Sequence, residues 1–257
     1  MTVNSYLVKR ASDAVLSSNE QSSIETSIST LRTRLYSYFT KDVSNHFKFG
    51  SSTRGTILPR SMDPQSDIDY MVVFKDVGYT PQTYLNKLSA FAKYWYSSSE
   101  IKQSTPSIVL ELNHIKFDLV PALKDTYGSG YQIPNGPNAW QSTNPNDFNA
   151  ALIQKNTDNK SLIKTTVRLL KFWNASKGYV FESFSLEKWV IDQYYYPQDN
   201  QRDYFLQSIE KLGINTTTQW RRDALERAKQ LVENVRQYER SGMLATAEAE
   251  VKKLIPE

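Results

Sequence analysis

Cysteine is absent from this chain of 257 residues, and histidine occurs only as His46 and His114. Without cysteine there can be no disulfide framework, no thiolate zinc site and no cysteine nucleophile. Two imidazoles are too few for a histidine-rich metal site, and they disfavour a Ser/His/Asp catalytic triad. Any chemistry that the protein performs must therefore come from other side chains.

Long apolar runs are also missing. Stretches such as 71–74 and 108–110 fall far short of the ~20 residues that a bilayer-spanning helix needs. The first residues lack the basic region and apolar run of a secretory signal, so we expect a cytoplasmic protein that makes no membrane contact. Lysine and arginine number 31 against 27 aspartates and glutamates, and the pI is near 9.0. This small excess suits anionic partners such as nucleotides but does not by itself indicate nucleic-acid binding.

Hydrophobic periodicity predicts an α+β fold. Apolar residues recur every three or four positions over 22–39, which indicates a long amphipathic helix. Short runs rich in β-branched and aromatic residues indicate strands. Because only Asn113 and His114 separate the last two runs, we expect these to form an antiparallel hairpin. The expected strands are 46–49, 67–74, 107–112 and 115–120.

The composition changes to Gly, Pro, Asn and Ser over 127–148, which predicts a long loop near a lobe boundary. We therefore place a catalytic lobe at 1–145, with a small mixed sheet backed by the long N-terminal helix. A helical lobe follows at 146–257. The helices expected after the loop are 159–176, 185–196, 203–212 and 218–240.

Asp67 and Asp69 lie two positions apart in a predicted strand, so their carboxylates project from the same face. The repulsion between two neighbouring anions is relieved by a cation, and hard carboxylate oxygens suit Mg²⁺ or Mn²⁺. A lone Asp-x-Asp is more typical of a solvated strand face, so the pair alone does not indicate a metal site.

A third carboxylate, Asp118, stands in an otherwise apolar strand whose opposite face carries Phe117 and Leu119. An acid in such surroundings must be paired, metal-bound or at an edge, since burying it alone is costly. It could simply accept backbone hydrogen bonds. Beside Asp67 and Asp69, however, it would complete a set that can hold two divalent ions ~3.5–4 Å apart, as in-line phosphoryl displacement requires.

Upstream of these strands, Gly50-Ser51 opens a run of small residues that ends at Thr56. Such a turn can cradle a phosphate with its backbone N–H groups where a helix begins. On its own, the run is more typical of a flexible loop. Its position before the acidic strands is what favours phosphate binding.

In this order, the residues resemble the nucleotidyltransferases of the DNA polymerase β-like superfamily, whose signature is an apolar residue with Gly-Ser, a two-carboxylate strand and a third acidic strand. Phe49-Gly50-Ser51, Asp67-Ile68-Asp69 and Asp118 match it. The resemblance narrows to the bacterial cGAS/DncV-like nucleotidyltransferases (CD-NTases) with a SMODS domain, enzymes of antiphage signalling operons. The long helix before the Gly-Ser turn supports this narrowing, as do the segments 117–122, 133–145 and 169–173. The Gly-Ser turn and Asp67 are somewhat farther apart in the sequence than is common in the superfamily, and we interpret 59–65 as a small loop insertion between them.

The resemblance implies a polymerase β-like lobe and a helical lobe with the active site in the cleft between them. It also implies two Mg²⁺ or Mn²⁺ ions held by three carboxylates, and donor phosphates held by residues of both lobes. The carboxylates are Asp67, Asp69 and Asp118. The phosphate-contacting residues are Gly50, Ser51, Lys171 and Ser183.

The implied reaction makes a cyclic di- or trinucleotide, or a related oligonucleotide, from nucleoside triphosphates without a nucleic-acid template. Its product would activate an effector protein. Three alternatives use the same residues: synthesis of linear oligonucleotides, possibly primed by a protein hydroxyl; nucleotidyl transfer to tRNA or a protein; and a nucleotide-binding module without activity. An intact set of three carboxylates disfavours the last.

Overall fold

The computed structural model describes residues 2–125, 128–145 and 147–257. Contacts along the chain divide it into two units. We call Ser17–Arg60 with Gln65–Asn149 the sheet unit, and Met1–Leu16, Ser61–Pro64 and Ala150–Glu257 the helical unit. The chain therefore passes from one unit to the other four times.

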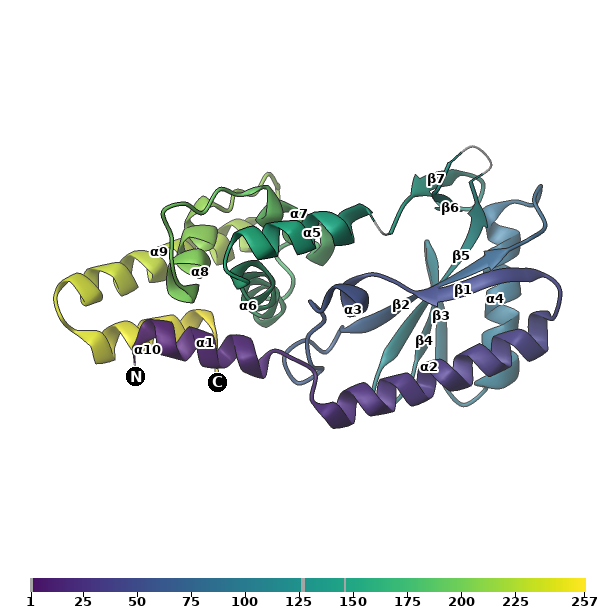
Figure 1. The fold of residues 1–257 in the computed structure, drawn as a ribbon, viewed down its shortest axis with the longest axis horizontal. Coiled ribbons are helices and arrows are strands. Elements are labelled where there is room, and N and C mark those ends of the chain that lie inside the picture. The colour runs from purple at the N-terminus through teal and green to yellow at the C-terminus, as the bar shows by residue number, and fades with distance from the viewer. Residues whose placement is uncertain (1, 126–127, 146) are drawn as a thin grey trace. The chain divides into compact units, whose positions relative to one another are not determined.

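The sheet unit contains a seven-stranded mixed sheet in the order β1-β2-β5-β4-β3, with β6 paired to β5 and β7 paired to β6 (Figure 1). Strands β2 and β5 are parallel, whereas β4 and β5 are antiparallel, as the short turn between them predicted. The strands are β1 (Val43–Lys48), β2 (Asp67–Phe74), β3 (Glu100–Ser104), β4 (Ser107–Glu111), β5 (Lys116–Lys124), β6 (Tyr131–Pro134) and β7 (Trp140–Thr143).

One face of the sheet is covered by the helices α2 (Ser18–Phe39) and α4 (Pro81–Trp95). Helix α2 begins at a capping box in which the side chains of Ser17 and Glu20 satisfy each other's backbone N–H groups. Its buried side chains are the apolar stripe that the sequence predicted. Phe39 at the end of this stripe packs edge-on against Phe74 of β2, at 5.3 Å between ring centroids.

The opposite face of the sheet is divided between an apolar part and a polar part. Met71, Val73 and Ala122 form a small buried cluster there. Partly buried side chains from β1, its following residue and β6 pack on it, among them Phe47 and Tyr131. The same face continues along β2 and β5 into the acidic residues, so this cluster supports the polar part from one side.

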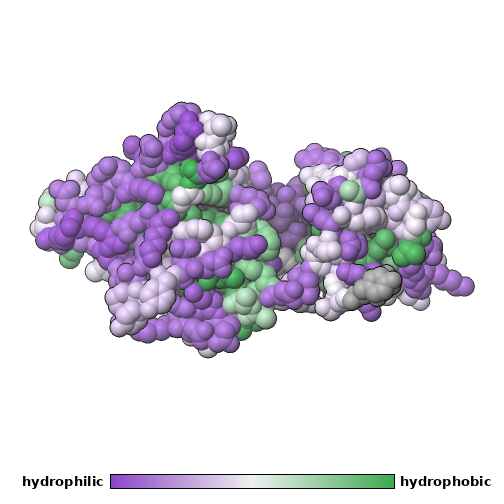
Figure 2. All heavy atoms as spheres, turned by 90° about the horizontal axis from the view of Figure 1, so that it is seen from above, coloured by the Kyte–Doolittle hydropathy of each residue, from purple (hydrophilic) through white to green (hydrophobic). Residues whose placement is uncertain are grey.

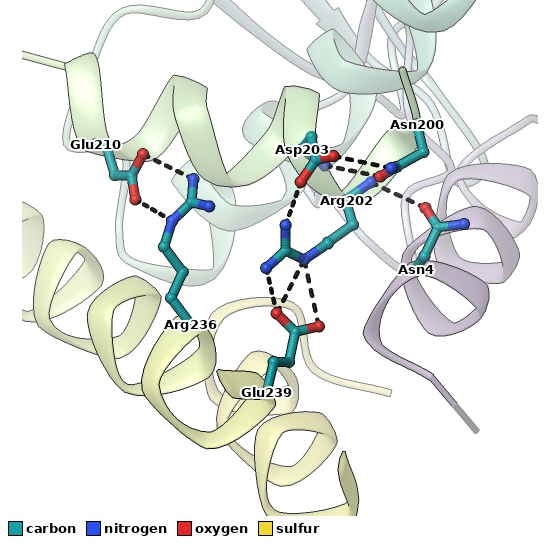
Figure 3. Close-up of polar contacts among 7 residues, drawn as sticks. All are labelled: Asn4, Asn200, Arg202, Asp203, Glu210, Arg236 and Glu239. Atoms are coloured by element: carbon teal, nitrogen blue, oxygen red, sulfur yellow. Dashed lines mark hydrogen bonds and ion pairs between the residues drawn. The ribbon is translucent and has the colours of Figure 1, made fainter. Parts of the chain in front are cut away.

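The helical unit is built from α1, most of α5 and the helices that follow. Tyr6 of α1 donates its hydroxyl to the carbonyl of Ile255, at 2.6 Å, and so ties the first helix to the end of the last. Arg202 joins α1, α8 and α9 through Asn4 and Glu239 (Figure 3). The helices are α1 (Val3–Asp13), α5 (Asp147–Asp158), α6 (Leu162–Ser176), α7 (Ser183–Asp192), α8 (Gln201–Lys211), α9 (Gln219–Arg240) and α10 (Leu244–Leu254).

The prediction of a long loop over 127–148 is wrong for most of that range. Its Gly, Pro and Asn residues belong largely to one turn, in which Gly136 takes a φ of +84° between the short strands β6 and β7. Helix α5 then begins at Asp147. Tyr127 and Asn146, which the prediction also included, lie outside the described residues.

The insertion over 59–65 is a segment without helix or strand, but it is not a free surface loop. Its central residues Ser61–Pro64 group with the helical unit. There, the Tyr179 hydroxyl donates to Asp63 Oδ1 at 2.6 Å, and Asp63 is buried. The insertion therefore anchors the chain to the helical unit between the Gly-Ser turn and β2.

Hydrophilic residues dominate the face drawn in Figure 2, where apolar residues form smaller groups. Exposed large apolar side chains occur on several elements, for example Tyr36 on α2, Ile153 on α5 and Trp220 on α9. Over the described part of the chain, no helix has both the length and the apolarity that a membrane span requires.

Candidate active site

Two adjacent strands carry the three predicted carboxylates on one face of the sheet. In the parallel pair β2–β5, Asp69 is the register partner of Asp118, and Asp67 is the partner of Lys116. Because positions two apart on a strand share a face, Asp67 projects on the same side as the other two acids. Ile68 between them is fully buried on the opposite face. The backbone register thus gathers the acids that lie far apart in the sequence.

Gly50 lies against the carboxylate of Asp69. Its φ is +70°, and a Cβ at this position would lie 1.8 Å from Asp69 Oδ2. Only glycine accepts both the left-handed backbone and this close approach. In addition, the Phe49 N–H donates to the Asp69 carbonyl at 2.9 Å. The Gly-Ser turn is therefore fixed directly to the acidic strand.

Ser51 is the first residue of the short helix α3 (Ser51–Arg54). The Thr56 N–H donates to its carbonyl at 3.1 Å, and the Thr53 N–H donates to the Gly50 carbonyl at 3.2 Å. These bonds close the small-residue run into a tight turn. The structure thus brings Gly50 to Asp69, with Ser51 next to it in the turn, while the contact of Gly50 and Ser51 with phosphates stays a prediction.

Asp118 has an unusual electrostatic environment. Its Oδ1 is buried and has no hydrogen-bond partner among the described residues, whereas its Oδ2 accepts a hydrogen bond from Ser107 Oγ at 3.2 Å. Burial, followed by the negative charge of Asp67, raises the pKa of the Asp118 carboxyl from 3.8 to about 6. The ionised acid is therefore held in a place that disfavours its charge.

Lys116 is the cation closest along the strand to these acids. Its Nζ lies 3.3 Å from Asp67 Oδ2, and both side chains are partly exposed. Its charge lowers the pKa of Asp118, but the effects of burial and Asp67 are larger. At Asp118, Lys116 thus offsets only part of the effect of burial and of the neighbouring acid.

The donor set fits a divalent cation in its chemistry. Carboxylate oxygens are the ligands that Mg²⁺ and Mn²⁺ prefer, and the orphaned Oδ1 of Asp118 is an acceptor that a cation would satisfy. In the arrangement of the side chains described here, no group of three or more His, Cys, Asp or Glu residues is drawn together closely enough to hold a metal. The carboxylates therefore match a cation in kind, and binding would require them to move closer.

Lys171 and Ser183 both lie in the helical unit. Lys171 on α6 is 6% exposed, and its Nζ donates to Glu187 Oε1 of α7 at 3.2 Å. Ser183 is the first residue of α7, after the N-cap Glu182. Helix α7 thus begins two residues before the predicted helix 185–196, and Ser185 in its first turn donates to the Glu182 side chain. The contact of Lys171 and Ser183 with a nucleotide stays a prediction.

Three polar residues around these positions were missed in the sequence: Ser107, Lys116 and Glu187. Lys116 could have been found, because it lies two positions before Asp118 in a predicted strand and so shares its face. Ser107 needs the register of β4 against β5, and Glu187 needs the packing of α6 against α7. Neither of these two carries a local signal.

Comparison with known proteins gives matches in sequence. Residues 1–156 match the profile of the Second Messenger Oligonucleotide or Dinucleotide Synthetase domain, SMODS. A probable cyclic nucleotide synthase of Bacillus cereus is 26% identical over 184 residues, which cover 57% of this chain and 54% of that protein. A cyclic AMP-AMP-AMP synthase of Acinetobacter is 27% identical over 155 residues, 58% of this chain and 39% of that protein. The matched region thus spans about half or less of these curated relatives.

A solved structure shows the same fold. The cyclic AMP-GMP synthase DncV of Vibrio cholerae, solved with a linear intermediate, superposes with a TM-score of 0.73 at 9% identity, covering 91% of each chain. The predicted α+β fold with a polymerase β-like nucleotidyltransferase lobe is thereby confirmed.

Proposed function

The chain belongs to the SMODS family of second messenger oligonucleotide or dinucleotide synthetase domains. We therefore propose that it is a nucleotidyltransferase that uses nucleoside triphosphates. Its product would be a cyclic di- or trinucleotide, or a related oligonucleotide. Both curated relatives are named as synthases of cyclic nucleotides. The proposal includes the role that the resemblance implies, a signal in antiphage defence that acts through an effector protein.

In the proposed reaction, a hydroxyl of one nucleotide attacks the α-phosphate of a second nucleoside triphosphate. A new P–O bond forms to that hydroxyl oxygen, the bond from the α-phosphorus to the bridging oxygen breaks, and pyrophosphate leaves. The hydroxyl proton is accepted by a carboxylate, for which we propose Asp118. Its position opposite Asp69, on the face of the sheet that carries the acids, supports this role.

Asp67, Asp69 and Asp118 are the residues that would hold Mg²⁺ or Mn²⁺, with Asp67 and Asp69 shared between two ions. When bound, such ions lower the pKa of an attacking hydroxyl and neutralise charge on the leaving group. Lys116 is already placed to balance part of the negative charge beside Asp67.

Gly50 and Ser51 would receive the β- and γ-phosphates of the donor. The small side chains leave room for phosphate oxygens near Asp69, and the close approach of Gly50 to Asp69 sets the distance between the phosphate turn and the acids. Lys171 and Ser183 would assist from the helical unit, since a compact ammonium suits a polyphosphate. For this, the Lys171 ammonium would have to leave or share its bond with Glu187.

The observation that carries the proposal is the register of Asp69 with Asp118, with Gly50 seated on Asp69. To test it, purified protein is incubated with each ribo- and deoxynucleoside triphosphate in Mg²⁺ or Mn²⁺, and the products are identified by mass spectrometry. We expect pyrophosphate and free cyclic or linear oligonucleotides from the wild type, and neither from Asp69→Asn.

The same experiment separates the alternatives. A nucleotide chain covalently attached to the protein, seen by intact mass, would indicate protein-primed synthesis. Pyrophosphate release that requires added tRNA or protein would indicate transfer to that acceptor. Nucleotide binding with no pyrophosphate release under any of these conditions would contradict a nucleotidyltransferase.

A further inference from the structure

Ser107 is a buried polar residue at the start of β4, where the β3–β4 hairpin closes. It is 2% exposed, and it is the register partner of Ser104, the last pair of that hairpin. On β4 it lies two positions from Val109, which is the register partner of Asp118. Its side chain therefore shares the face of the sheet that carries the acids.

The Ser107 hydroxyl has two acceptors within reach. Its Oγ lies 3.0 Å from the Ser104 carbonyl oxygen and 3.2 Å from Asp118 Oδ2. A hydroxyl carries one proton and two lone pairs, and a bond to an ionised carboxylate is stronger than one to a neutral carbonyl. The single proton is therefore donated to Asp118 when that acid is ionised, and Oγ then holds one oxygen of Asp118.

The two oxygens of Asp118 are consequently not equivalent. Oδ2 is held by Ser107, whereas Oδ1 is buried and has no partner among the described residues. Buried polar atoms in folded proteins almost always have a partner, so this oxygen is an acceptor that a bound cation would satisfy.

We propose that Ser107 is a positioning residue for Asp118: its hydroxyl holds Oδ2 and thereby reserves Oδ1 for a divalent cation. The inference rests on the proposed function, because it assigns to Asp118 a metal that the reaction needs. Residues that orient a ligand from behind are a general feature of metal sites, and their loss commonly weakens metal affinity about 10- to 100-fold.

The test is Mn²⁺ binding to the full chain without nucleotide, measured by the electron paramagnetic resonance signal of free Mn²⁺. Ser107→Ala should raise the Kd for Mn²⁺ at least about 10-fold, and Ser107→Thr, which keeps the hydroxyl, should restore most of the affinity. In turnover assays, Ser107→Ala should lower kcat and raise the Mn²⁺ concentration needed for half-maximal rate, with the KM for nucleotide unchanged.

Ser104→Ala is the matched control, because the Ser104 side chain is exposed and its carbonyl acceptor remains. It should leave Mn²⁺ affinity unchanged. Thermal unfolding without metal reports whether each variant folds. If Ser107→Thr does not fold, the comparison of Ser107→Ala with Ser104→Ala still decides the question.

Two outcomes would overturn the inference, and they are distinguishable. Mn²⁺ binding that is lost in Asp118→Asn but unchanged in Ser107→Ala would remove Ser107 and leave the proposed function intact. Mn²⁺ affinity that is the same in the wild type and in Asp118→Asn would remove the metal from Asp118, and both the inference and the proposed reaction with it.

Discussion

Charged side chains are treated in opposite ways in the two units. In the helical unit, the Arg202 guanidinium donates to both oxygens of Glu239 and to Asp203, and Arg236 donates to Glu210 (Figure 3). On the sheet face, Lys116 pairs with Asp67, and the Oδ1 of Asp118 lacks a hydrogen-bond partner among the described residues.

The difference separates charges that stabilise the fold from charges that await a ligand. Paired charges with several hydrogen bonds stabilise the helices that they join. Crowded carboxylates cost free energy in the unliganded protein, and that cost is recovered only when cations or substrates bind. Substitutions in the two regions should therefore have opposite effects on stability and activity.

Asp69→Asn should have the largest effect, and it should act on activity rather than on stability. Removing one carboxylate from the reacting face should lower turnover on the order of 10³-fold, because a metal site supplies several kcal/mol of transition-state stabilisation. Asp69 is only partly buried, so the unfolding temperature should stay close to that of the wild type. Product formation by mass spectrometry and thermal unfolding measure the two effects. Wild-type rates at saturating Mg²⁺ would remove Asp69 from the reaction.

In the helical unit, Lys171→Ala should act first on stability rather than on activity. It leaves the Glu187 carboxylate, which is 1% exposed, without the ammonium that it contacts, and breaking a buried pair costs about 3–5 kcal/mol. The double variant Lys171→Met with Glu187→Leu should recover most of that stability, because replacing a whole buried pair is nearly neutral. Urea unfolding measures both.

The folded double variant also tests the predicted role of Lys171. If its ammonium contacts the triphosphate, the apparent KM for nucleotide should rise while the fold stays intact. An unchanged KM would confine Lys171 to a structural pair with Glu187.

Asp118→Asn should stabilise the protein when metal is removed with a chelator. The folded pKa of this acid is about 6, against 3.8 as the ordinary value, so the folded state holds its proton more tightly than the unfolded state. The contribution of Asp118 to the free energy of unfolding is then fully present below about pH 4 and is lost as the pH rises through about 6. At neutral pH the loss amounts to about 3 kcal/mol.

Asparagine carries no such penalty. The variant should therefore be more stable than the wild type at pH 7.5 without metal, and the two should converge near pH 4. Urea unfolding at both pH values measures this difference. A variant that is equally stable to the wild type at pH 7.5 would show that the Asp118 carboxyl is not strained by its surroundings.

Arg202→Ala should have the smallest effect of the four and should act on the fold. Both Arg202 and Glu239 are 21% exposed, and losing their charge-assisted bonds should cost about 2 kcal/mol of unfolding free energy. The control is Arg240→Ala, whose pair with Glu233 is 70% and 61% exposed and should change stability by less than about 0.5 kcal/mol. Equal unfolding midpoints for the two variants would contradict the role of this network.

The parts of the fold that were predicted from the sequence are those with a strong local period. Strand 67–74 matches β2, and the predicted helix 22–39 ends with α2 at Phe39. Helix α1 was missed although it has a local signal: its buried residues Val3, Tyr6, Leu7 and Ala11 follow the spacing of an amphipathic helix. The sequence does not show what this short helix packs against, because its partners lie at the other end of the chain.

The site divides in the same way. Gly50, Asp67 and Asp69 belong to short motifs that indicate their chemistry once they are taken together with Asp118, in their order along the chain. Ser107 and Glu187 depend on which strand or helix lies beside them, and such tertiary pairing is not encoded in any local pattern. This is why the residues expected to touch substrate were named from the sequence while those that hold them were not.

The bond between Tyr6 and Ile255 also bears on how the helical unit opens. Its two partners lie 249 positions apart in the sequence, and Val3, Tyr6 and Leu7 of α1 are buried. Because α1 packs on α6, α8 and α10, opening either of the outer helices exposes apolar surface that the other also covers. Helices α1 and α10 should therefore open together in native-state hydrogen exchange rather than fray separately.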